Sequence, residues 1–394
     1  MAKLLEITGK AISGEWGQDD DTGTGIPVLR TTNFTNEGFV NYKNVVTRSI
    51  SKKNIAEKYL RHGDVIIEKS GGSDKQPVGR VIFFEGEENK YLFNNFTGLL
   101  RVQNPEEWLP KYVFYALYAY YRNGGTRAFE NRTTGLHNLQ VDNYVKSVDI
   151  PKLSYRKQQH ICKTLDHVRD AVSYREQQLT KLDELVKARF VEMFGDPSDN
   201  AEGWPILSLN DIISTIESGW SGNGKQRKKA PGEIAVLKVS AVTKGYFIPT
   251  ECKVLDDQSN IKKYVFPQKG DLLFSRANTR EMVGATALIN QDYPELILPD
   301  KLWKIQFSEN VDVVYMKYIL SSKTIRDLFS AASTGTSGSM YNVSMEKFRS
   351  IVVPIPPLSL QNQFADFVAE VDKSKLFAEL FAQNTCILAE NRSK

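Results

Sequence analysis

The amino-acid sequence predicts an α+β protein built from two globular domains that repeat each other. Two long antiparallel helices, forming a coiled coil, are expected to separate these domains. Three observations lead to this fold class. Residues 154–194 contain neither proline nor glycine, similar motifs recur at a spacing of about 200–208 residues, and the remaining segments mix short β-rich runs with few helices.

The length of the chain sets the expected domain limits. At 394 residues the chain is long enough for two or more domains, each with its own hydrophobic core. The repeat places a globular domain at 1–151, a long helix at 152–195, a second globular domain at 196–356 and a second long helix at 357–394.

The repeat consists of short motifs that occur twice in the same order. They are an apolar strand ending in a basic residue (26–30 and 234–238), a Gly-Asp turn before a buried strand (63–67 and 270–274), a Val-Gly pair (78–79 and 283–284), a Tyr-rich helix (111–122 and 313–328), a Thr-Gly run (134–135 and 334–338) and an Ile-Pro lead-in (150–154 and 355–359). Each motif is weak alone, but their shared order indicates one unit written twice.

The long stretch carries a heptad seam. Steps of four and three residues give apolar side chains, interrupted only at Arg175 and Arg189, and polar residues occupy the positions between them. The seam residues are Ile161, Leu165, Val168, Val172, Leu179, Leu182 and Val186, with Phe364, Val368 and Val371 beginning the second copy. About 38 helical residues make a rod of roughly 57 Å. An ordinary core helix is the alternative, but core helices average about 11–12 residues. A rod of this length needs a partner, and the second rod is the obvious one.

Composition narrows the class of protein. No apolar run approaches the 18–20 residues of a membrane span, and the N-terminus lacks the apolar core of a signal peptide. The cysteines Cys162, Cys252 and Cys386 are odd in number and scattered, which indicates a reducing cytoplasm and neither a disulfide framework nor a zinc site. The net charge of +4 permits a nucleic-acid partner but does not demand one.

Motifs for catalysis are missing from the sequence. It has no Gly-rich phosphate loop, no HExxH and no Asn/Asp-Pro-Pro-aromatic tetrad. Pro299-Asp300 could begin a nuclease motif, but no matching partner follows. The four histidines lie apart or on a helix flank, and a solvated helix face explains His160 and His167 better than a metal site. We therefore expect no catalytic residue, no metal and no cofactor on this chain.

Polar loops of both globular domains have the chemistry of DNA contacts. Lys, Arg, Ser and Thr bind phosphates, whereas Arg reads guanine and Asn or Gln reads adenine. In the first domain the candidate DNA-binding residues are Arg30, Thr32, Asn33, Lys69, Ser73, Lys75, Arg127, Arg132, Thr134 and Asn138. In the second domain they are Lys225, Gln226, Arg227, Lys228, Lys238, Arg276, Asn278, Arg280, Thr336 and Asn342. An isolated surface Arg is usually only solvated, so each set matters more than any single member.

The two-copy plan resembles the specificity (S) subunit of Type I restriction–modification enzymes over essentially the whole chain. The Gly-Asp-apolar turn, the Ile-Pro-(Pro)-Leu-Ser lead-in and the helix starts at Gln158 and Gln361 carry the resemblance. The two copies depart from each other where Tyr155-Arg156-Lys157 precedes the first glutamine and only Leu360 precedes the second.

The resemblance implies two target-recognition domains held apart by a spacer of paired helices. It also implies a non-catalytic subunit that reads an asymmetric bipartite target in double-stranded DNA. Two modification subunits would dock on it and methylate adenine with S-adenosylmethionine, and restriction subunits would use ATP and Mg²⁺. All of those active sites would lie on other chains.

Two other functions are compatible with parts of the sequence. One is the recognition part of a fused methyltransferase–nuclease, which would require catalytic motifs on this chain. The other is a coiled-coil adaptor without a DNA role, which would leave the paired globular domains and their polar loops unexplained.

Overall fold

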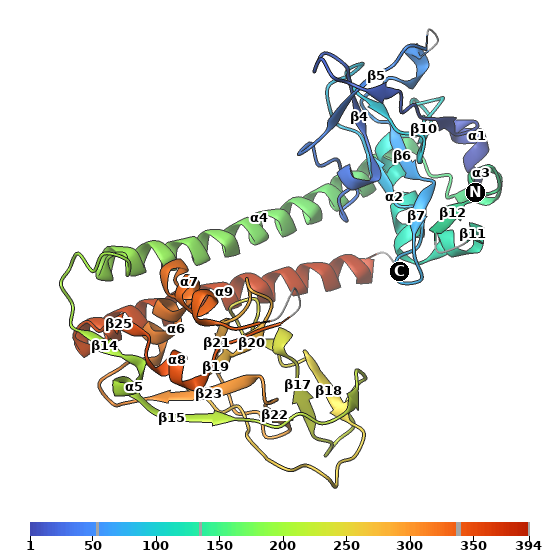
Figure 1. Ribbon diagram of the computed structural model, residues 1–394. Helices are drawn as coiled ribbons and strands as arrows, with labels where there is room; N and C mark the ends of the chain where they lie inside the picture. The colour runs from blue at the N-terminus through green and yellow to red at the C-terminus, as the bar shows by residue number, and fades with distance from the viewer. Residues whose placement is uncertain (53–54, 134–135, 336–339, 393–394) are drawn as a thin grey trace. The chain divides into compact units, whose positions relative to one another are not determined.

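The computed structural model describes residues 1–52, 55–133, 136–335 and 340–392 (Figure 1). Contacts divide the chain into two compact units, Met1–Ala171 and Val172–Lys394. The boundary falls inside one long helix, so each unit consists of a globular part and a share of that helix. In the part of the chain described, no helix combines the length and apolar character of a membrane span.

The first unit is built on two four-stranded sheets. One has the order β2-β10-β6-β8 with antiparallel neighbours, and the other has the order β3-β5-β4-β9, in which β4 and β9 are parallel. A small sheet of order β11-β12-β7 and the pair β1-β13 complete the unit. The strands are β1 (Ala2–Lys3), β2 (Ile12–Ser13), β3 (Gln18–Asp19), β4 (Ile26–Leu29), β5 (Val46–Ser49), β6 (Val65–Glu68), β7 (Ser70–Gly72), β8 (Val81–Phe83), β9 (Leu92–Phe93), β10 (Thr97–Leu100), β11 (Glu130–Thr133), β12 (Leu136–Leu139) and β13 (Asp149–Ile150).

Both faces of the first sheet are buried, which explains why its strands are continuously apolar. On β6, Val65 and Ile67 pack into one core cluster and Ile66 packs into another, as the two-residue period of a strand requires. The larger cluster includes Phe114 of helix α2. The helices are α1 (Leu4–Thr8), α2 (Pro110–Arg122) and α3 (Val141–Ser147), with 3-10 turns η1 (Thr31–Asn33), η2 (Ala56–Lys58) and η3 (Gly125–Phe129).

The second unit repeats this plan. Its sheets have the orders β15-β23-β19-β21 and β16-β18-β17-β22, and again the last pair of the second sheet, β17 and β22, is parallel. The pairs β14-β25 and β20-β24 correspond to β1-β13 and β7-β12. The strands are β14 (Ile206–Ser208), β15 (Ile213–Ser218), β16 (Gly224–Lys225), β17 (Ala235–Leu237), β18 (Cys252–Leu255), β19 (Leu272–Ser275), β20 (Ala277–Asn278), β21 (Thr286–Leu288), β22 (Leu296–Ile297), β23 (Leu302–Phe307), β24 (Tyr341–Asn342) and β25 (Val352–Pro354).

One helix of the second unit differs from the sequence prediction. The Tyr-rich helix expected at 313–328 is divided into α6 (Val313–Ser321) and α7 (Lys323–Ala332). Ser322 lies between them in an extended conformation, and its side chain accepts a hydrogen bond from the backbone of Ile325. A serine in this role starts a new helix, so the break has a local cause. The remaining short helices are α5 (Leu209–Ile212) and α8 (Met345–Arg349), with the 3-10 turn η4 (Val239–Ala241).

The Gly-Asp turns of the repeat work in the same way in both units. Asp64 and Asp271 each accept a backbone hydrogen bond of 2.7 Å from three residues earlier, at Arg61 and Gln268. Each carboxylate also forms an ion pair with a cation on the neighbouring strand of the sheet. Arg101, directly after β10, lies at 2.7 Å in the first unit, and Lys304 of β23 lies at 3.0 Å in the second. The aspartate therefore closes its own turn and ties that turn to the neighbouring strand, which accounts for the duplicated motif.

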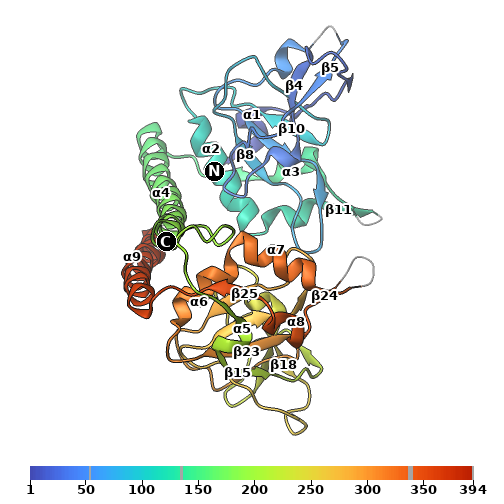
Figure 2. The ribbon, with the colours of Figure 1, turned by 60° about the vertical axis from the view of Figure 1, so that its left-hand side comes forward.

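The two long helices are α4 (Tyr155–Phe194) and α9 (Leu358–Arg392). Within the second unit, the last turns of α4 lie alongside the first part of α9 in both Figure 1 and Figure 2. Phe190 and Phe194 contact Phe364, and Asp183 pairs with Lys375 at 2.7 Å. Since earlier residues of α4 meet later residues of α9, the pairing is antiparallel, as the sequence predicts.

The helix seam follows the predicted positions only in part. Leu182, Val186, Phe364, Val368 and Val371 belong to one hydrophobic cluster of the second unit. Ile161 instead packs against the core of the first unit, next to the buried Cys162. The side chains of Leu165, Val168, Val172 and Leu179 are half-buried. At the end of α4 the buried residues are Phe190 and Phe194. Of the residues that the heptad pattern selects there, Met193 is partly buried against the same cluster and Arg189 lies over the ring of Phe367.

Candidate nucleic-acid interface

A small strand pair of the second unit gathers four of the predicted DNA-binding residues. Strand β20 contains Asn278 and pairs with β24, which contains Asn342, and the carbonyl of Arg276 accepts a hydrogen bond of 2.9 Å from Val343. Arg280 follows β20, with its guanidinium 6.0 Å from the ring centroid of Tyr341. The sequence separates these residues by more than 60 positions, and the strand pairing brings them together.

The four side chains are held to different degrees. Arg276 lies over the ring of Trp303 at 5.8 Å, and its Nε is buried without a hydrogen-bond partner among the described residues. Asn278 accepts a hydrogen bond of 2.8 Å from the backbone of Thr279. Arg280 is exposed. Arg276 is therefore pre-positioned by packing, whereas the exposed Arg280 is held at the surface by a hydrogen bond of 3.4 Å from its Nε to the hydroxyl of Ser330 and by its contact with Tyr341.

The basic loop at 225–229 carries less free charge than its sequence suggests. Arg227 forms two hydrogen bonds of 2.7 Å to the carboxylate of Glu233, and this contact holds the pKa of Glu233 down to about 2. Lys229 pairs with Glu295, and Lys238 pairs with Glu251 at 2.8 Å while also donating to Gln226. Lys225 and Lys228 remain exposed without an ion pair in the described chain, so they are the cations most available to DNA.

The first unit places its own candidates around the sheet β11-β12-β7. Asn138 on β12 pairs with Ser70 on β7, and Lys69 directly precedes β7. Ser73 and Lys75 lie in the exposed loop that follows, and Arg127 donates a hydrogen bond of 3.1 Å to the carbonyl of Asp74 in that loop. Burial lowers the pKa of Lys69, whose ammonium donates to Ser13 at 2.8 Å.

Lys69 and Arg276 occupy equivalent positions in the two units. Their backbone N–H groups donate to Phe96 and Lys301 at 2.8 and 3.1 Å, and their carbonyls accept from Leu139 and Val343 at 2.8 and 2.9 Å. By the same pairing, Asn138 corresponds to Asn342. The sequence put both loops in the same slot of the repeat, and the hydrogen bonds specify which residues match.

A second candidate region lies after strands β4 and β17, where Arg30 and Lys238 each precede a 3-10 turn. Arg30 donates a hydrogen bond of 3.3 Å to the carbonyl of Asn44, and Thr32 is exposed. Asn33 differs from the prediction. Its side chain is only 1% exposed and is bonded to the backbone of Arg30, Asn41 and Lys43. These bonds give Asn33 a structural role in the turn and leave it no free edge for a base.

Three predicted residues lie partly or wholly outside the described residues. Thr134 and Thr336 are not described, and for Arg132 the structure describes the backbone of β11 alone.

Sequence reasoning did not identify a buried polar cluster beneath the candidate loops of the first unit. Arg80 pairs with Glu68 at 3.2 Å, and burial raises the pKa of that carboxyl group. Glu130 accepts a hydrogen bond of 3.0 Å from the backbone of Val78 and contacts His137 Nδ1 at 3.0 Å. The partners are far apart in sequence, so only the strand pairing reveals them. They fix the base of the loops that carry Lys69, Ser73 and Asn138.

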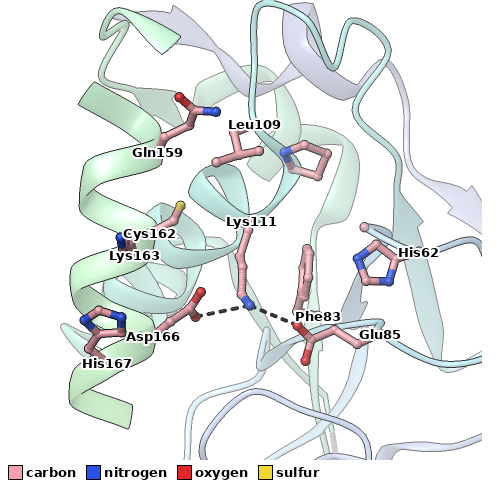
Figure 3. A pocket seen from close by; sticks show the side chains of 12 residues that line it. His62, Phe83, Glu85, Leu109, Lys111, Gln159, Cys162, Lys163, Asp166 and His167 are labelled. Atoms are coloured by element: carbon pink, nitrogen blue, oxygen red, sulfur yellow. Dashed lines mark hydrogen bonds and ion pairs between the residues drawn. The ribbon is translucent and has the colours of Figure 1, made fainter. Parts of the chain in front are cut away.

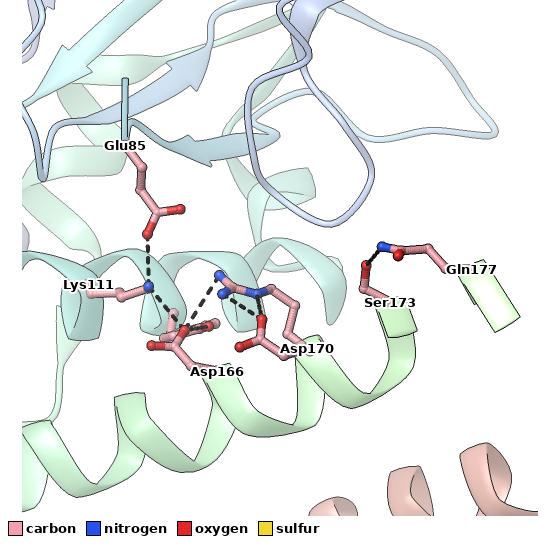
Figure 4. Close-up of polar contacts among 8 residues, drawn as sticks. Glu85, Lys111, Asp166, Asp170, Ser173 and Gln177 are labelled. Atoms are coloured by element: carbon pink, nitrogen blue, oxygen red, sulfur yellow. Dashed lines mark hydrogen bonds and ion pairs between the residues drawn. The ribbon is translucent and has the colours of Figure 1, made fainter. Parts of the chain in front are cut away.

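A hollow of about 470 Å³ lies in the first unit where α4 begins (Figure 3). Lys111 spans it and pairs with Glu85 at 2.9 Å and Asp166 at 3.1 Å. Tyr115 donates a 2.6 Å hydrogen bond to the same Asp166, and Arg169 pairs with the neighbouring Asp170 (Figure 4). Burial raises the pKa of the Cys162 thiol to about 11, which makes this cysteine a poor nucleophile. The ion pair and the hydrogen bond to Asp166 therefore anchor the start of α4 to the first unit.

Buried glutamines fix the start of each long helix to its own globular part. Gln158 accepts a hydrogen bond of 2.8 Å from the backbone of Leu109 and donates to the carbonyls of Glu107 and Leu153. Gln361 accepts from Asp312 at 2.8 Å and donates to Pro356 at 2.7 Å. Both side chains are fully buried, so the candidate DNA-binding loops rest on frameworks that are rigidly joined to the helices.

Comparison with known proteins finds similarity to specificity subunits of Type I restriction enzymes. Residues 201–380 match the family described as Type I restriction modification DNA specificity domain. The chain is 25% identical over 194 residues to the Type I restriction enzyme EcoEI specificity subunit of Escherichia coli, a match covering 48% of this chain and 33% of that protein. It is 24% identical over 375 residues to the EcoKI specificity subunit of E. coli strain K12, covering 90% of this chain and 76% of that protein.

Solved structures confirm the fold. An S subunit of a Type I restriction–modification system from M. genitalium aligns with 99% of this chain and 93% of its own, with a TM-score of 0.55 and 14% identity. A structure concerned with complex assembly of the type I R-M system aligns over the same shares, with a TM-score of 0.51 and 15% identity. At these identities the likeness concerns the fold.

Proposed function

Because the chain resembles the specificity subunits of Type I restriction–modification enzymes, we propose that it is a non-catalytic subunit that reads an asymmetric bipartite DNA target. The observation that carries the proposal is the duplication of one framework with different polar side chains at equivalent positions. Lys69 in the first unit corresponds to Arg276 in the second. Two frameworks of the same fold with different reading groups suit two different half-sites.

Each unit would read its half-site through side chains at the small strand pairs β7-β12 and β20-β24. The major groove distinguishes all four base pairs, and Arg on guanine and Asn on adenine are its commonest specific contacts. Arg276, Asn278, Asn342 and Asn138 fit this role. Exposed cations such as Lys75, Lys225, Lys228 and Arg280 would bind phosphates and set the register of the complex.

The paired helices would set the distance between the half-sites. The 40 residues of α4 make a helix of about 60 Å. Readers on one face of the duplex are separated by multiples of about 34–36 Å, the length of one turn. The proposed spacer is supported by the length of α4 and by its contacts in each unit, through Asp166 and Gln158 in the first and through Phe190 and Phe194 in the second.

The reactions would belong to partner chains. Two modification subunits would dock on this chain and methylate adenine with S-adenosylmethionine, and restriction subunits would supply ATP- and Mg²⁺-dependent translocation and cleavage. Because the chain matches only a third of the length of the first relative named above, these partners are part of the proposal.

The first experiment replaces Arg276, Asn278 and Arg280 with alanine in the complete complex with its modification subunits. Methylation mapping by single-molecule sequencing should show loss of recognition at one half-site, with each lost base contact costing about 1–3 kcal/mol. The matched variant Lys69→Ala should affect the other half-site. Equally weakened binding to all DNA sequences would show that these side chains contact only phosphates. Loss of recognition at both half-sites from one variant would contradict the proposal that each unit reads its own half-site.

The second experiment inserts seven helical residues after Gln177, in an exposed stretch of α4. The insertion adds about 10 Å and about two helical turns, so the faces of the helix keep their orientation. The mapped target should gain spacer length with both half-sites unchanged. As a control, seven residues inserted in the loop at 198–202 should leave the spacer as it was. An unchanged spacer in the first variant would refute the role of α4 as a ruler.

A further inference from the structure

The first unit contains a polar cavity beside its candidate reading strands. Its volume is about 540 Å³, within the range of small-ligand sites. Lys69, Asn138 and Asp142 contribute polar groups, Asn95 and Phe96 come from the loop before β10, and Ala11 closes one side. Phe96 is 54% exposed, which is unusual for a phenylalanine and offers a flat apolar surface.

The polar side chains around the cavity are not used by the fold. Among the residues described, the side chains of Asn95, Asn138 and Asp142 have no hydrogen-bond partner. The ammonium of Lys69 is partly satisfied by Ser13 at 2.8 Å. Elsewhere in the same unit, comparable amide side chains form hydrogen bonds with the backbone, as for Asn33 and Gln158. The cavity therefore offers free donors and acceptors next to an exposed ring.

The second unit has a tryptophan where the first unit has Gly98. Gly98 pairs with Ile67 and Ser13, and Trp303 pairs with the equivalent Phe274 and Ser218. A Cβ atom at position 98 would lie 3.4 Å from Cδ of Lys69 and 3.6 Å from Cβ of Ala11, both of which line the cavity. Trp303 is 1% exposed and packs against Phe274 and Phe348. The first unit thus has no side chain at the position that an indole fills in the second.

We propose that this cavity receives a single nucleobase swung out of the DNA bound by the first unit. The inference rests on the proposed function and deepens it. Proteins that hold an extruded base stack it on an apolar or aromatic side chain and hydrogen-bond its edge. Phe96 supplies the stacking surface, and the amide of Asn95 with the carboxylate of Asp142 supplies donors and acceptors for the edge.

The charges of the cavity favour a base over a phosphate. Lys69 is its one cation and Asp142 its one carboxylate in the described lining, so the two charges cancel. A phosphate would meet the carboxylate of Asp142, whereas a neutral base would not. The position also fits, because Lys69 and Asn138 belong to the loops proposed to reach the grooves. In the second unit, Arg276 lies against Trp303, which leaves no space there for an extruded base.

The test measures the binding of mismatched duplexes to the complete complex with its modification subunits. Each position of the half-site that Lys69→Ala identifies is mismatched in turn, leaving out the methylated adenine. Extrusion costs a few kcal/mol and is easiest at a mismatch, so one position should bind about tenfold more tightly than the matched duplex. Mismatches in the half-site of the second unit should give no such gain.

Two kinds of variant decide whether the cavity is responsible. Gly98→Phe should fill it and abolish the gain, while binding to the half-site of the second unit is retained. Asn95→Ala combined with Asp142→Ala should reduce the gain without changing packing, which guards against misfolding of the first variant. A gain at no position, or a gain that survives both variants, overturns the proposal.

Other outcomes separate this inference from the function on which it rests. If the wild-type complex lacks sequence-specific binding at both half-sites, the proposed function fails first. If Gly98→Phe instead weakens association with the modification subunits and mismatches have no effect, the cavity holds a partner side chain and no base.

Discussion

The two units share one framework but attach the long helix α4 by different chemistry. In the first unit Asp166 of α4 joins Lys111 and Tyr115 through an ion pair and a hydrogen bond. In the second unit Phe190 and Phe194 pack into a cluster with Tyr315, Tyr318 and Phe364. The Gly-Asp turns and the buried glutamines form equivalent hydrogen bonds in both. The repeat therefore fixes the backbone scaffold and leaves the side chains that contact α4 free to differ.

The largest expected effect comes from the aromatic attachment. Phe190→Ala removes a buried ring that lies 5.0 Å from the ring centroid of Phe194 and 5.4 Å from that of Phe364. Truncation of a buried phenylalanine costs about 3–5 kcal/mol through lost burial and the cavity left behind. Denaturant unfolding, followed by probes in each unit, should show the loss in the second unit. Leu185→Ala on the exposed side of α4 is the matched control and should cost little.

The same variant distinguishes two descriptions of the helix seam. If the heptad positions Arg189 and Met193 carried the contact, Met193→Ala would cost more than Phe190→Ala. The opposite order is expected, because Phe190 is 5% exposed and Met193 only partly buried.

The next effect tests the shared part of the framework. Gln158→Leu and Gln361→Leu keep side-chain volume but leave buried backbone groups at Leu109 and Asp312 unpaired. Each should cost about 1–3 kcal/mol, and each in its own unit. Hydrogen exchange at the amides of Leu109 and Asp312 should accelerate only in the corresponding variant. The exposed neighbours Gln159 and Gln363 provide leucine controls. A large loss of stability in only one unit would show that the two glutamines contribute unequally to the stability of their units.

Much of the framework could be predicted from the sequence because its signals are local and occur twice. The Gly-Asp turns, the Ile-Pro lead-ins and the glutamines at 158 and 361 mark positions where the backbone itself needs a particular residue. The orders of the sheets and the parallel pairs β4-β9 and β17-β22 depend on contacts between distant segments, and no local motif specifies them.

The end of the helix seam includes two buried residues that the heptad pattern did not select, for a geometric reason. A straight α-helix drifts by about 20° per heptad from a strict seven-residue repeat. After several heptads the buried face includes Phe190 and Phe194, which contact Tyr315 and Phe364. Met193 is only partly buried against the same cluster, and Arg189 lies over the ring of Phe367.

Candidate reading residues were harder to predict, because burial and pairing decide what a polar side chain is free to do. The side-chain amide of Asn33 donates its hydrogen bonds to backbone carbonyls near its own turn. Lys229 is neutralised by Glu295, 66 residues further along the chain. The equivalence of Lys69 and Arg276 likewise needs the hydrogen-bond register of two sheets.

The smallest effect concerns a lysine that the first unit replaces by an aromatic residue. The hydrogen bonds of Tyr112 to Pro151 and of Tyr315 to Pro354 align α2 with α6, so that Lys317 corresponds to Phe114. Phe114 is fully buried in the first core. Lys317 lies over the ring of Tyr318 at 4.0 Å, and burial lowers its pKa from 10.5 to about 8.

This lowered pKa predicts a pH-dependent gain from Lys317→Met. The unfolded chain binds the proton more tightly than the folded one, so the charged lysine destabilises the fold fully below about pH 8, and the penalty fades as pH rises towards 10.5. The contact with Tyr318 offsets part of it, which leaves a gain on the order of 1 kcal/mol at pH 7. Urea unfolding between pH 7 and pH 10 should show the advantage of methionine shrinking. The exposed Lys181→Met should change stability by less than about 0.5 kcal/mol, and a gain that is constant with pH would mean that packing, and not the buried charge, distinguishes the two units here.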